Sequence, residues 1–144
     1  MKLSTRTRYG LRLMIKLAMS YGSRPAQLGE ISQTEGISEK YLGQIVIILK
    51  NSGLIESVRG AQGGFLLSRP PEKITVLEIA QTLEGDLSIV PCTETNSECE
   101  RTTQCVSRSV WVELKNAIES VLIKYTLKDL IDMETTKPSN MFYI

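Results

Sequence analysis

Three cysteines lie close together in the second half of the chain. Cys92, Cys99 and Cys105 fall in the stretch PCTETNSECERTTQC, with six and then five residues between successive thiols. Thiols grouped in this way can hold an iron–sulfur cluster, ligate zinc, react as redox thiols or cluster by chance. An odd number of cysteines argues against a disulfide framework. Zinc is the weaker metal hypothesis, because its sites usually contain closely spaced cysteine pairs.

The remaining composition argues against an enzyme. The 144 residues include no histidine, which excludes histidine acid–base catalysis, a Ser-His-Asp triad and histidine metal ligands. No phosphate-binding glycine motif precedes a helix, and no paired acids stand at a cleft-like spacing. With 42% hydrophobic and 23% charged residues, the chain is typical of a soluble globular protein. Its longest uncharged apolar run, 45–49, is far too short to span a membrane, so we expect a cytoplasmic location.

The net charge of +1 hides two oppositely charged halves. Residues 1–69 contain ten Lys or Arg against four Asp or Glu, and residues 70–144 contain seven against twelve. The first 29 residues hold six cations and no acid, namely Lys2, Arg6, Arg8, Arg12, Lys16 and Arg24. A basic N-terminal half indicates a phosphate-rich partner such as DNA, although a solvated cationic helix face is the alternative.

The elements expected in this basic half follow the order of a helix-turn-helix unit. Ser4 can cap a first helix, and a second helix is expected over 27–35, ending at Gly36. Ser38 then caps a third helix that ends at Gly53. Two helices joined by a short glycine-containing turn are typical of this motif, whose last helix reads DNA. The apolar stripe of the third helix comprises Leu42, Ile45, Val46 and Leu49.

A hairpin follows the third helix directly. Residues 54–59 and 65–68 alternate as strands, with the glycine-rich turn 60–64 between them. A hairpin in this place, with Arg59 at its tip, predicts a DNA-binding wing. The helix expected over 74–83 packs back on this unit. We therefore predict a mainly α fold with a small β-hairpin wing, in which residues 1–90 form a winged helix-turn-helix domain with a packing helix.

The second half is expected to mediate dimerisation. After the cysteine loop, 91–105, a helical pattern runs over 106–130, and its apolar residues recur every three or four positions. We interpret it as a dimerisation helix, because proteins that read palindromic DNA need two copies; a core helix of the same chain is the alternative. The tail, 131–144, is polar and then ends in MFYI, which should dock on the dimer or on a partner. The seam of the helix comprises Trp111, Leu114, Ile118, Val121 and Tyr125.

Three long stretches resemble a known family. MKLSTRTRYGLR, GISEKYLGQIVIILKNSGLIESVRGAQGGFLL and ITVLEIAQTLEG are similar to the winged-helix regulators that include the iron–sulfur cluster regulator (IscR), the nitric-oxide-sensing repressor (NsrR) and the cysteine-metabolism repressor (CymR). The resemblance implies a homodimer with swapped long helices that binds a pseudo-palindromic double-stranded operator. It also implies that Cys92, Cys99 and Cys105 hold a [2Fe–2S] cluster through which the regulator senses iron–sulfur or redox status.

Two positions depart from the pattern of the cluster-bearing members. Arg108 stands where the iron–sulfur regulator has a histidine ligand, and Arg8 stands where the nitric-oxide sensor has an aspartate ligand. Because a guanidinium stays protonated and has no free lone pair, neither arginine can ligate iron. The fourth ligand is therefore open, with candidates that comprise solvent, Glu94, Glu98, Glu100 and Ser107.

The ending 141–144 points to a second hypothesis. The sequence MFYI resembles the end of the cysteine-metabolism repressor, a family member without a cluster that binds cysteine synthase. The alternative function is therefore a cluster-free cysteine-metabolism repressor. Thiol oxidation or cysteine synthase bound at the tail would control it.

The resemblance also implies which residues contact DNA. Gln44 can pair with adenine, Ser38, Lys40 and Tyr41 lie at the same end of the recognition helix, and Ser38 and Tyr41 suit phosphates. Gly43 replaces a discriminating glutamate, which should change the base preference. Arg59 is expected to enter the minor groove, and Gly60, Gly63 and Gly64 to let the protein backbone approach the phosphates closely. Lys2 and Ser4 are expected to contact the DNA backbone.

Overall fold

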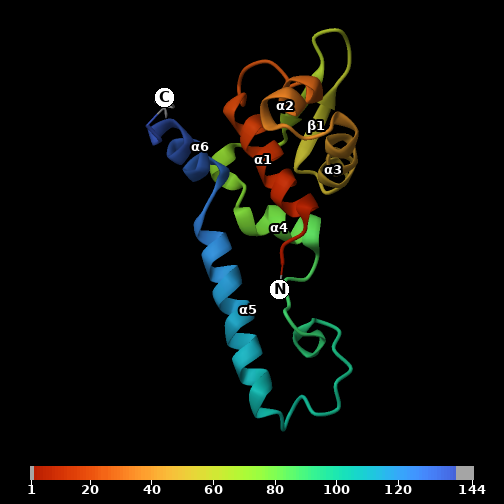
Figure 1. Cartoon of the computed structure of the whole chain (residues 1–144), viewed down its shortest axis with the longest axis vertical. Helices are drawn as coiled ribbons and strands as arrows, with labels where there is room; N and C mark the ends of the chain where they lie inside the picture. The colour runs from red at the N-terminus through yellow and green to blue at the C-terminus, as the bar shows by residue number, and fades with distance from the viewer. Residues whose placement is uncertain (1, 139–144) are drawn as a thin grey trace, which may run out of the picture.

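A computed structural model describes residues 2–138. Six α-helices and one hairpin dominate it, with short 3-10 turns at Pro71–Lys73 and Pro91–Thr93. Figure 1 shows all of the α-helices and strands except α5 gathered at one end, while α5 and the cysteine loop extend away from them. No helix in this part of the chain is long and apolar enough to cross a membrane. The elements are α1 (Thr5–Met19), α2 (Leu28–Glu35), α3 (Glu39–Asn51), β1 (Ile55–Val58), β2 (Gly64–Leu67), α4 (Val76–Glu84), α5 (Val106–Lys124) and α6 (Leu127–Thr136).

The capping signals of the first three helices act as the sequence predicts. The Ser4 side chain accepts a hydrogen bond from the N–H of Thr7, and the Ser38 side chain accepts one from the N–H of Tyr41. Gly36 ends α2 with φ 64°, a left-handed conformation that favours glycine. The expected helix-turn-helix order is therefore present.

The hairpin is the expected wing, with one additional partner. β1 and β2 pair antiparallel, from Ile55 opposite Leu67 to Val58 opposite Gly64. Outside the hairpin, Ala26 and Phe65 exchange two backbone hydrogen bonds of 3.0 and 2.8 Å. The segment between α1 and α2 therefore holds β2 in place.

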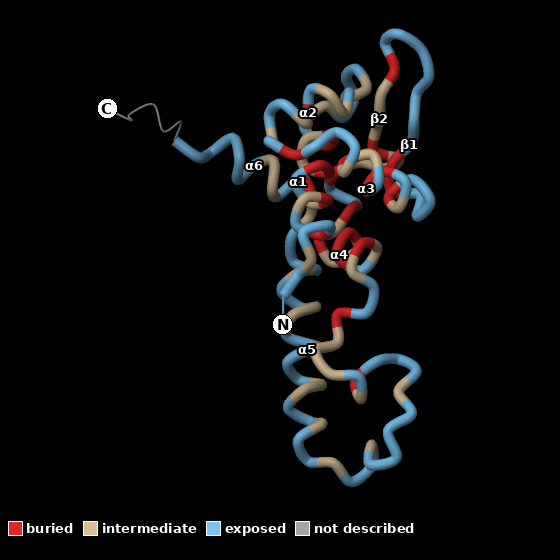
Figure 2. The backbone as a smooth tube through the Cα atoms, turned by 45° about the vertical axis from the view of Figure 1, so that its right-hand side comes forward, coloured by how far each residue is buried: buried red, intermediate tan, exposed pale blue. Residues whose placement is uncertain are grey.

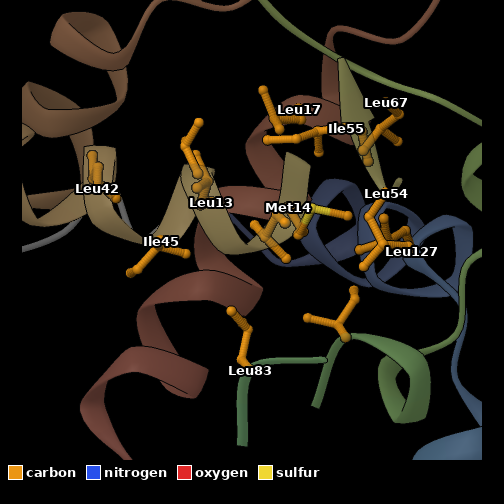
Figure 3. Close-up of a cluster of buried hydrophobic side chains, with 14 of the residues drawn as sticks. Leu13, Met14, Leu17, Leu42, Ile45, Leu54, Ile55, Leu67, Leu83 and Leu127 are labelled. Carbon is orange, nitrogen blue, oxygen red and sulfur yellow. The ribbon is translucent and has the colours of Figure 1, made fainter. Parts of the chain in front are cut away.

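One apolar core joins the helices and the hairpin. Its fully buried side chains come from α1, α3, the β1 region, α4 and, unexpectedly, the start of α6. Figure 3 shows Leu127 beside Leu54, among side chains from the N-terminal half. The C-terminal helix thus completes the core of the predicted DNA-binding domain. The fully buried residues drawn and labelled there include Leu13, Met14, Leu17, Leu42, Ile45 and Leu83.

The single helix predicted over 106–130 is wrong, because two helices occupy this region. α5 ends at Lys124, Tyr125 is extended, and Thr126 starts α6 through a capping box with Asp129. Backbone bonds fix the break: the Val76 N–H donates to the Tyr125 carbonyl at 2.8 Å, and the Leu127 N–H donates to the Ile74 carbonyl at 3.0 Å. Part of the predicted polar tail is consequently helical, as far as Thr136. The MFYI ending, 141–144, lies outside the described residues.

Helix α5, which projects from the other helices, differs from every other α-helix in its burial. None of its residues is buried within the chain. In Figure 2 its tube and the cysteine loop are coloured almost entirely as exposed or intermediate, whereas the buried segments gather around α1, α3 and α4.

Candidate nucleic-acid interface and cysteine loop

The first turns of α3 present the predicted reading residues on the surface. Ser38, Lys40 and Gln44 are exposed, and Ser38 also supplies the N-cap. Tyr41 is half-buried, because its ring packs edge-to-face on Tyr9 of α1 with centroids 5.9 Å apart. Lys40 and Gln44 are therefore free to meet a groove, while Tyr41 also braces α3 against α1.

The wing tip exposes Arg59 and Gly60, and Gly60 has φ 109°. The next two predicted glycines have internal reasons to be glycine. Gly63 is buried, its N–H donates to the Gly60 carbonyl, and an added Cβ would lie 2.2 Å from the carbonyl oxygen of Val58. A Cβ on Gly64 would lie 2.4 Å from the Ala26 carbonyl oxygen. Close packing of the hairpin on itself and on the α1–α2 segment therefore requires glycine at these two positions, and phosphate approach there stays a prediction.

Half of the six N-terminal cations are already paired. The Glu35 carboxylate accepts a hydrogen bond from Arg12 Nε at 2.7 Å and forms a salt bridge with Lys16 Nζ at 3.2 Å. Arg24 forms a salt bridge with Glu30 at 3.0 Å. Burial raises the pKa of Glu35, but the hydrogen bonds from Arg12 and Lys16 outweigh it and lower the pKa overall. Within 2–138, the cations that enter no salt bridge include Lys2, Arg6, Arg8, Lys40 and Arg59.

The start of α1 lies at the end of the domain away from the wing (Figures 1 and 2). Ser4 donates from its backbone N–H and its hydroxyl to Glu84 of α4, at 3.1 and 2.7 Å, and Thr7 donates to the same carboxylate. These bonds, from Thr7 first and then Ser4, lower the pKa of Glu84. Lys2 lines a cleft of about 140 Å³ with Glu84 and Ile118 of α5. The hydroxyl of Ser4 therefore joins α1 to α4 and is not available to a phosphate.

The three cysteines are not brought together. Cys92 and Cys105 are half-buried, Cys99 is exposed, and all three are free thiols. Among residues 2–138, no group of three histidine, cysteine, aspartate or glutamate side chains could hold a metal ion. The loop in this arrangement does not fit a [2Fe–2S] cluster.

Local hydrogen bonds favour the thiolate form of Cys105. It is the N-cap residue of α5, and its Sγ lies 3.1 Å from the Ser107 hydroxyl. Hydrogen bonds from the Ser107 hydroxyl and then from the Arg108 N–H lower the pKa of Cys105, with a smaller contribution from Arg101. A lower pKa raises the thiolate fraction at neutral pH, and the thiolate is the reactive form.

Two cations of α5 hold the start of the cysteine loop through its backbone. Arg108 Nε donates to the Cys92 carbonyl at 3.1 Å, so this arginine positions Cys92. Lys115 Nζ donates to the Thr93 carbonyl at 3.3 Å and pairs with Asp86 at 3.0 Å. Ser88 first, and then Lys115, hold the pKa of Asp86 far below its usual range. Sequence reasoning missed Glu84, Asp86 and Lys115, because each meets partners that are distant along the chain.

The apolar surface of α5 is shifted from the predicted seam. Leu114, Val121 and Tyr125 are exposed as expected for an interface, but Trp111 and Ile118 are half-buried within the chain. The exposed large apolar side chains that the prediction left out are Val106, Val110 and Ile123. Counting four residues per step would have added Val106 and Val110.

The chain is similar over its whole length to known transcriptional regulators. Residues 3–133 match the Rrf2 family, described as an iron-dependent transcriptional regulator. The HTH-type transcriptional regulator CymR of Bacillus subtilis is 40% identical, over all of both chains. A solved structure of B. subtilis CymR, titled the global cysteine regulator, has a TM-score of 0.78 at 41% identity and covers 92% of this chain and 98% of its own.

A second similar structure is that of an IscR protein. IscR of T. potens has a TM-score of 0.78 at 37% identity and covers 99% of this chain and 97% of its own. Both CymR matches are named as regulators and not as enzymes, which agrees with the composition argument. The winged helix-turn-helix described above and these similarities lead to one conclusion: the chain belongs to the Rrf2 family of DNA-binding transcriptional regulators.

Proposed function

We propose that the protein is a homodimeric repressor, located in the cytoplasm, that binds a pseudo-palindromic operator with α3 in the major groove and the wing beside it. The observation that carries the proposal is the set of exposed polar side chains on α3 and the wing. Lys40, Gln44 and Arg59 are exposed, and neither of the two cations enters a salt bridge within the described chain. Unpaired cations beside an amide suit phosphate contact and base reading.

The second subunit would pack on α5. Val110, Leu114 and Val121 lie within about 40° of one another around the helix, and their exposed fractions are 55%, 41% and 50%. Apolar stripes of this kind are buried when a second amphipathic helix packs on them. A two-fold dimer would also place two copies of α3 on one operator.

The cysteine loop would receive the signal through its thiols without a cluster. Three observations support this proposal: the three thiols do not meet, Arg108 engages the Cys92 carbonyl, and the pKa of Cys105 is lowered. The full-length similarity to B. subtilis CymR, whose solved structure is titled the global cysteine regulator, agrees with a role in cysteine metabolism.

A contiguous set of polar contacts would carry the signal toward α1. Lys115 bridges Thr93 of the loop and Asp86, which follows α4. Two residues earlier, Glu84 holds the N-terminal turn of α1 through Ser4 and Thr7. Modification of the loop would alter the position of α4 relative to α1, and with it the position of α3.

A second candidate is sensing through a [2Fe–2S] cluster on Cys92, Cys99 and Cys105. The similarity to T. potens IscR over 99% of this chain favours it, as does the presence of all three thiols in one loop. The loop would have to rearrange to bring these thiols together.

Metal analysis separates the two candidates. The protein is purified without oxygen, subjected to cluster reconstitution, and examined by visible absorption with iron and sulfide assays. We expect a colourless, iron-free protein. A brown protein with about two irons and two sulfides per chain, whose colour is lost in Cys92→Ala, would replace the proposal with the cluster sensor.

Thiol reactivity tests the proposed sensor directly. Cys105 should react with iodoacetamide several-fold faster than Cys99 at pH 7.5, because its lowered pKa increases the thiolate fraction. Ser107→Ala should lower the alkylation rate of Cys105 and leave that of Cys99 unchanged, as followed by peptide mass spectrometry. Equal rates for the two cysteines in the wild-type protein would contradict an activated Cys105.

The proposal includes cysteine synthase as a partner of the tail. Residues 141–144, MFYI, which resemble the ending of the cysteine-metabolism repressor, would make this contact. Deletion of residues 141–144 should abolish binding to purified cysteine synthase in calorimetry and leave operator binding unchanged. Equal binding by the full-length and shortened chains would remove this partner site from the proposal.

A further inference from the structure

The surface of α3 that points away from the core contains one large apolar side chain. Ile47 is 59% exposed, which is the highest value among the large apolar residues between 2 and 90. The helix packs its opposite side in the core through Leu42, Ile45, Val46 and Leu49. The exposure of Ile47 is therefore a property of the helix surface and not of a loose core.

Ile47 lies on the same line as the residues expected to meet DNA. At 100° per residue, Lys40, Gln44 and Ile47 fall within about 60° of one another, opposite the buried stripe. Lys40, Gln44 and Ile47 are all exposed. Any surface that Gln44 contacts along α3 therefore also meets Ile47.

A neighbouring glycine leaves Ile47 uncovered. A helical side chain leans toward the preceding turn, so the surface beside Ile47 belongs to residue 43. This residue is Gly43, and a Cβ built on it would have no neighbour within 4 Å. The methyl groups of Ile47 are thus open to a partner that approaches along the helix.

We propose that Ile47 is a specificity-determining residue that contacts the C5-methyl group of a thymine in each half-site. This inference rests on the proposed role of α3 as the recognition helix. In the major groove, thymine alone among the four bases presents a methyl group, and apolar side chains contact it. The rise of about 1.5 Å per residue places Ile47 about 4.5 Å along the helix from Gln44, close to the base-pair step of about 3.4 Å. Ile47 therefore reads a base pair next to the one that Gln44 contacts, or one step further.

Deoxyuridine provides a test that removes only this methyl group. The preferred duplex is first selected from a random library with the full-length protein. Each thymine pair related by the two-fold symmetry is then replaced by deoxyuridine, and affinity is measured by fluorescence anisotropy. At the position that Ile47 contacts, replacing thymine by deoxyuridine should lower the wild-type affinity about fourfold per half-site. This is the effect of losing about one buried methyl group. Ile47→Ala should bind the thymine and uracil duplexes equally.

The controls distinguish this inference from the proposed function. Met19→Ala removes an exposed apolar side chain from α1 and should keep the full sensitivity to uracil. Gln44→Ala should alter the selected sequence, and an unchanged sequence would overturn the assignment of α3 itself. If α3 is confirmed in this way, the Ile47 inference is overturned when no uracil substitution weakens the wild-type protein. It is also overturned when Ile47→Ala retains the uracil effect, or when this variant changes the oligomeric state.

Discussion

The two ends of the molecule are held by different kinds of interaction. Around α1, α3 and α4, each helix buries an apolar stripe in one core, with Leu13, Leu42 and Ile79 fully inaccessible. In α5 no residue is buried, and the adjoining loop is anchored by side-chain contacts to backbone carbonyls. The first region is stabilised by an apolar core within the chain. The second exposes an apolar face that a second subunit can cover, and it carries three thiols that can react.

The largest contrast between the regions should appear in stability. Leu42→Ala removes a side chain with no exposed surface and leaves a cavity, so the free energy of unfolding should fall by about 3 kcal/mol. Val106→Ala, at a side chain that is 86% exposed, should change it by less than about 0.5 kcal/mol. Guanidinium unfolding of both variants measures the difference. Similar losses for the two would show that Val106 is buried, either within the chain or against a second subunit.

The next contrast concerns assembly. Leu114→Asp places a charge on the exposed apolar stripe of α5, and we expect sedimentation to show monomers. Affinity for a two-half-site duplex should then fall about 100-fold or more, because the second half-site is no longer linked to the first. Asn116→Asp adds the same charge outside the stripe of the same helix, and this variant should remain dimeric. A dimeric Leu114→Asp protein would place the interface elsewhere.

The smallest effect concerns the polar joint between α1 and α4. Glu84→Gln weakens the bonds from Ser4 and Thr7, and it should lower the free energy of unfolding at pH 7 by about 1 kcal/mol. Because the native pKa of Glu84 is lowered, its contribution is full above the unfolded pKa of about 4.3 and decreases as pH falls through the native value. The gap between wild type and variant should therefore narrow below about pH 4.3.

Denaturant titrations at several pH values measure this gap. Glu56→Gln, on the exposed face of β1, is measured in parallel as the control. A gap for Glu84→Gln that stays constant down to pH 3 would contradict the role of the ionised carboxylate.

Local signals explain which parts of the fold could be predicted. The serine caps at Ser4 and Ser38, the left-handed Gly36 and the wing turn act within a few residues, and each is present in the structure. The break between α5 and α6 also has a local signal, since Thr126 and Asp129 stand at capping-box spacing. The apolar periodicity continues across this break and favours one long helix, so it hides the cap.

The errors at the candidate site come from contacts between distant residues. Ser4 meets Glu84 eighty positions away, and Arg12 meets Glu35. Charge counting cannot tell a cation already held by a carboxylate from one that is free to bind phosphate. The packing of Gly64 against Ala26 likewise depends on tertiary contact. Residue types therefore predicted a basic surface, but not which of its side chains are already bonded to other residues of the chain.

The burial of Leu127 has a consequence for how the protein is made. This side chain fills the core beside Leu54, and its N–H pairs with Ile74, although α5 and the cysteine loop separate it from both in sequence. A ribosome that has synthesised the whole winged helix-turn-helix has therefore not yet supplied all of the core. The last contact closes a long loop, and such closures slow folding. Nascent chains should acquire a stable DNA-binding half only after α6 has emerged, at a point when the helix proposed for dimerisation is already complete.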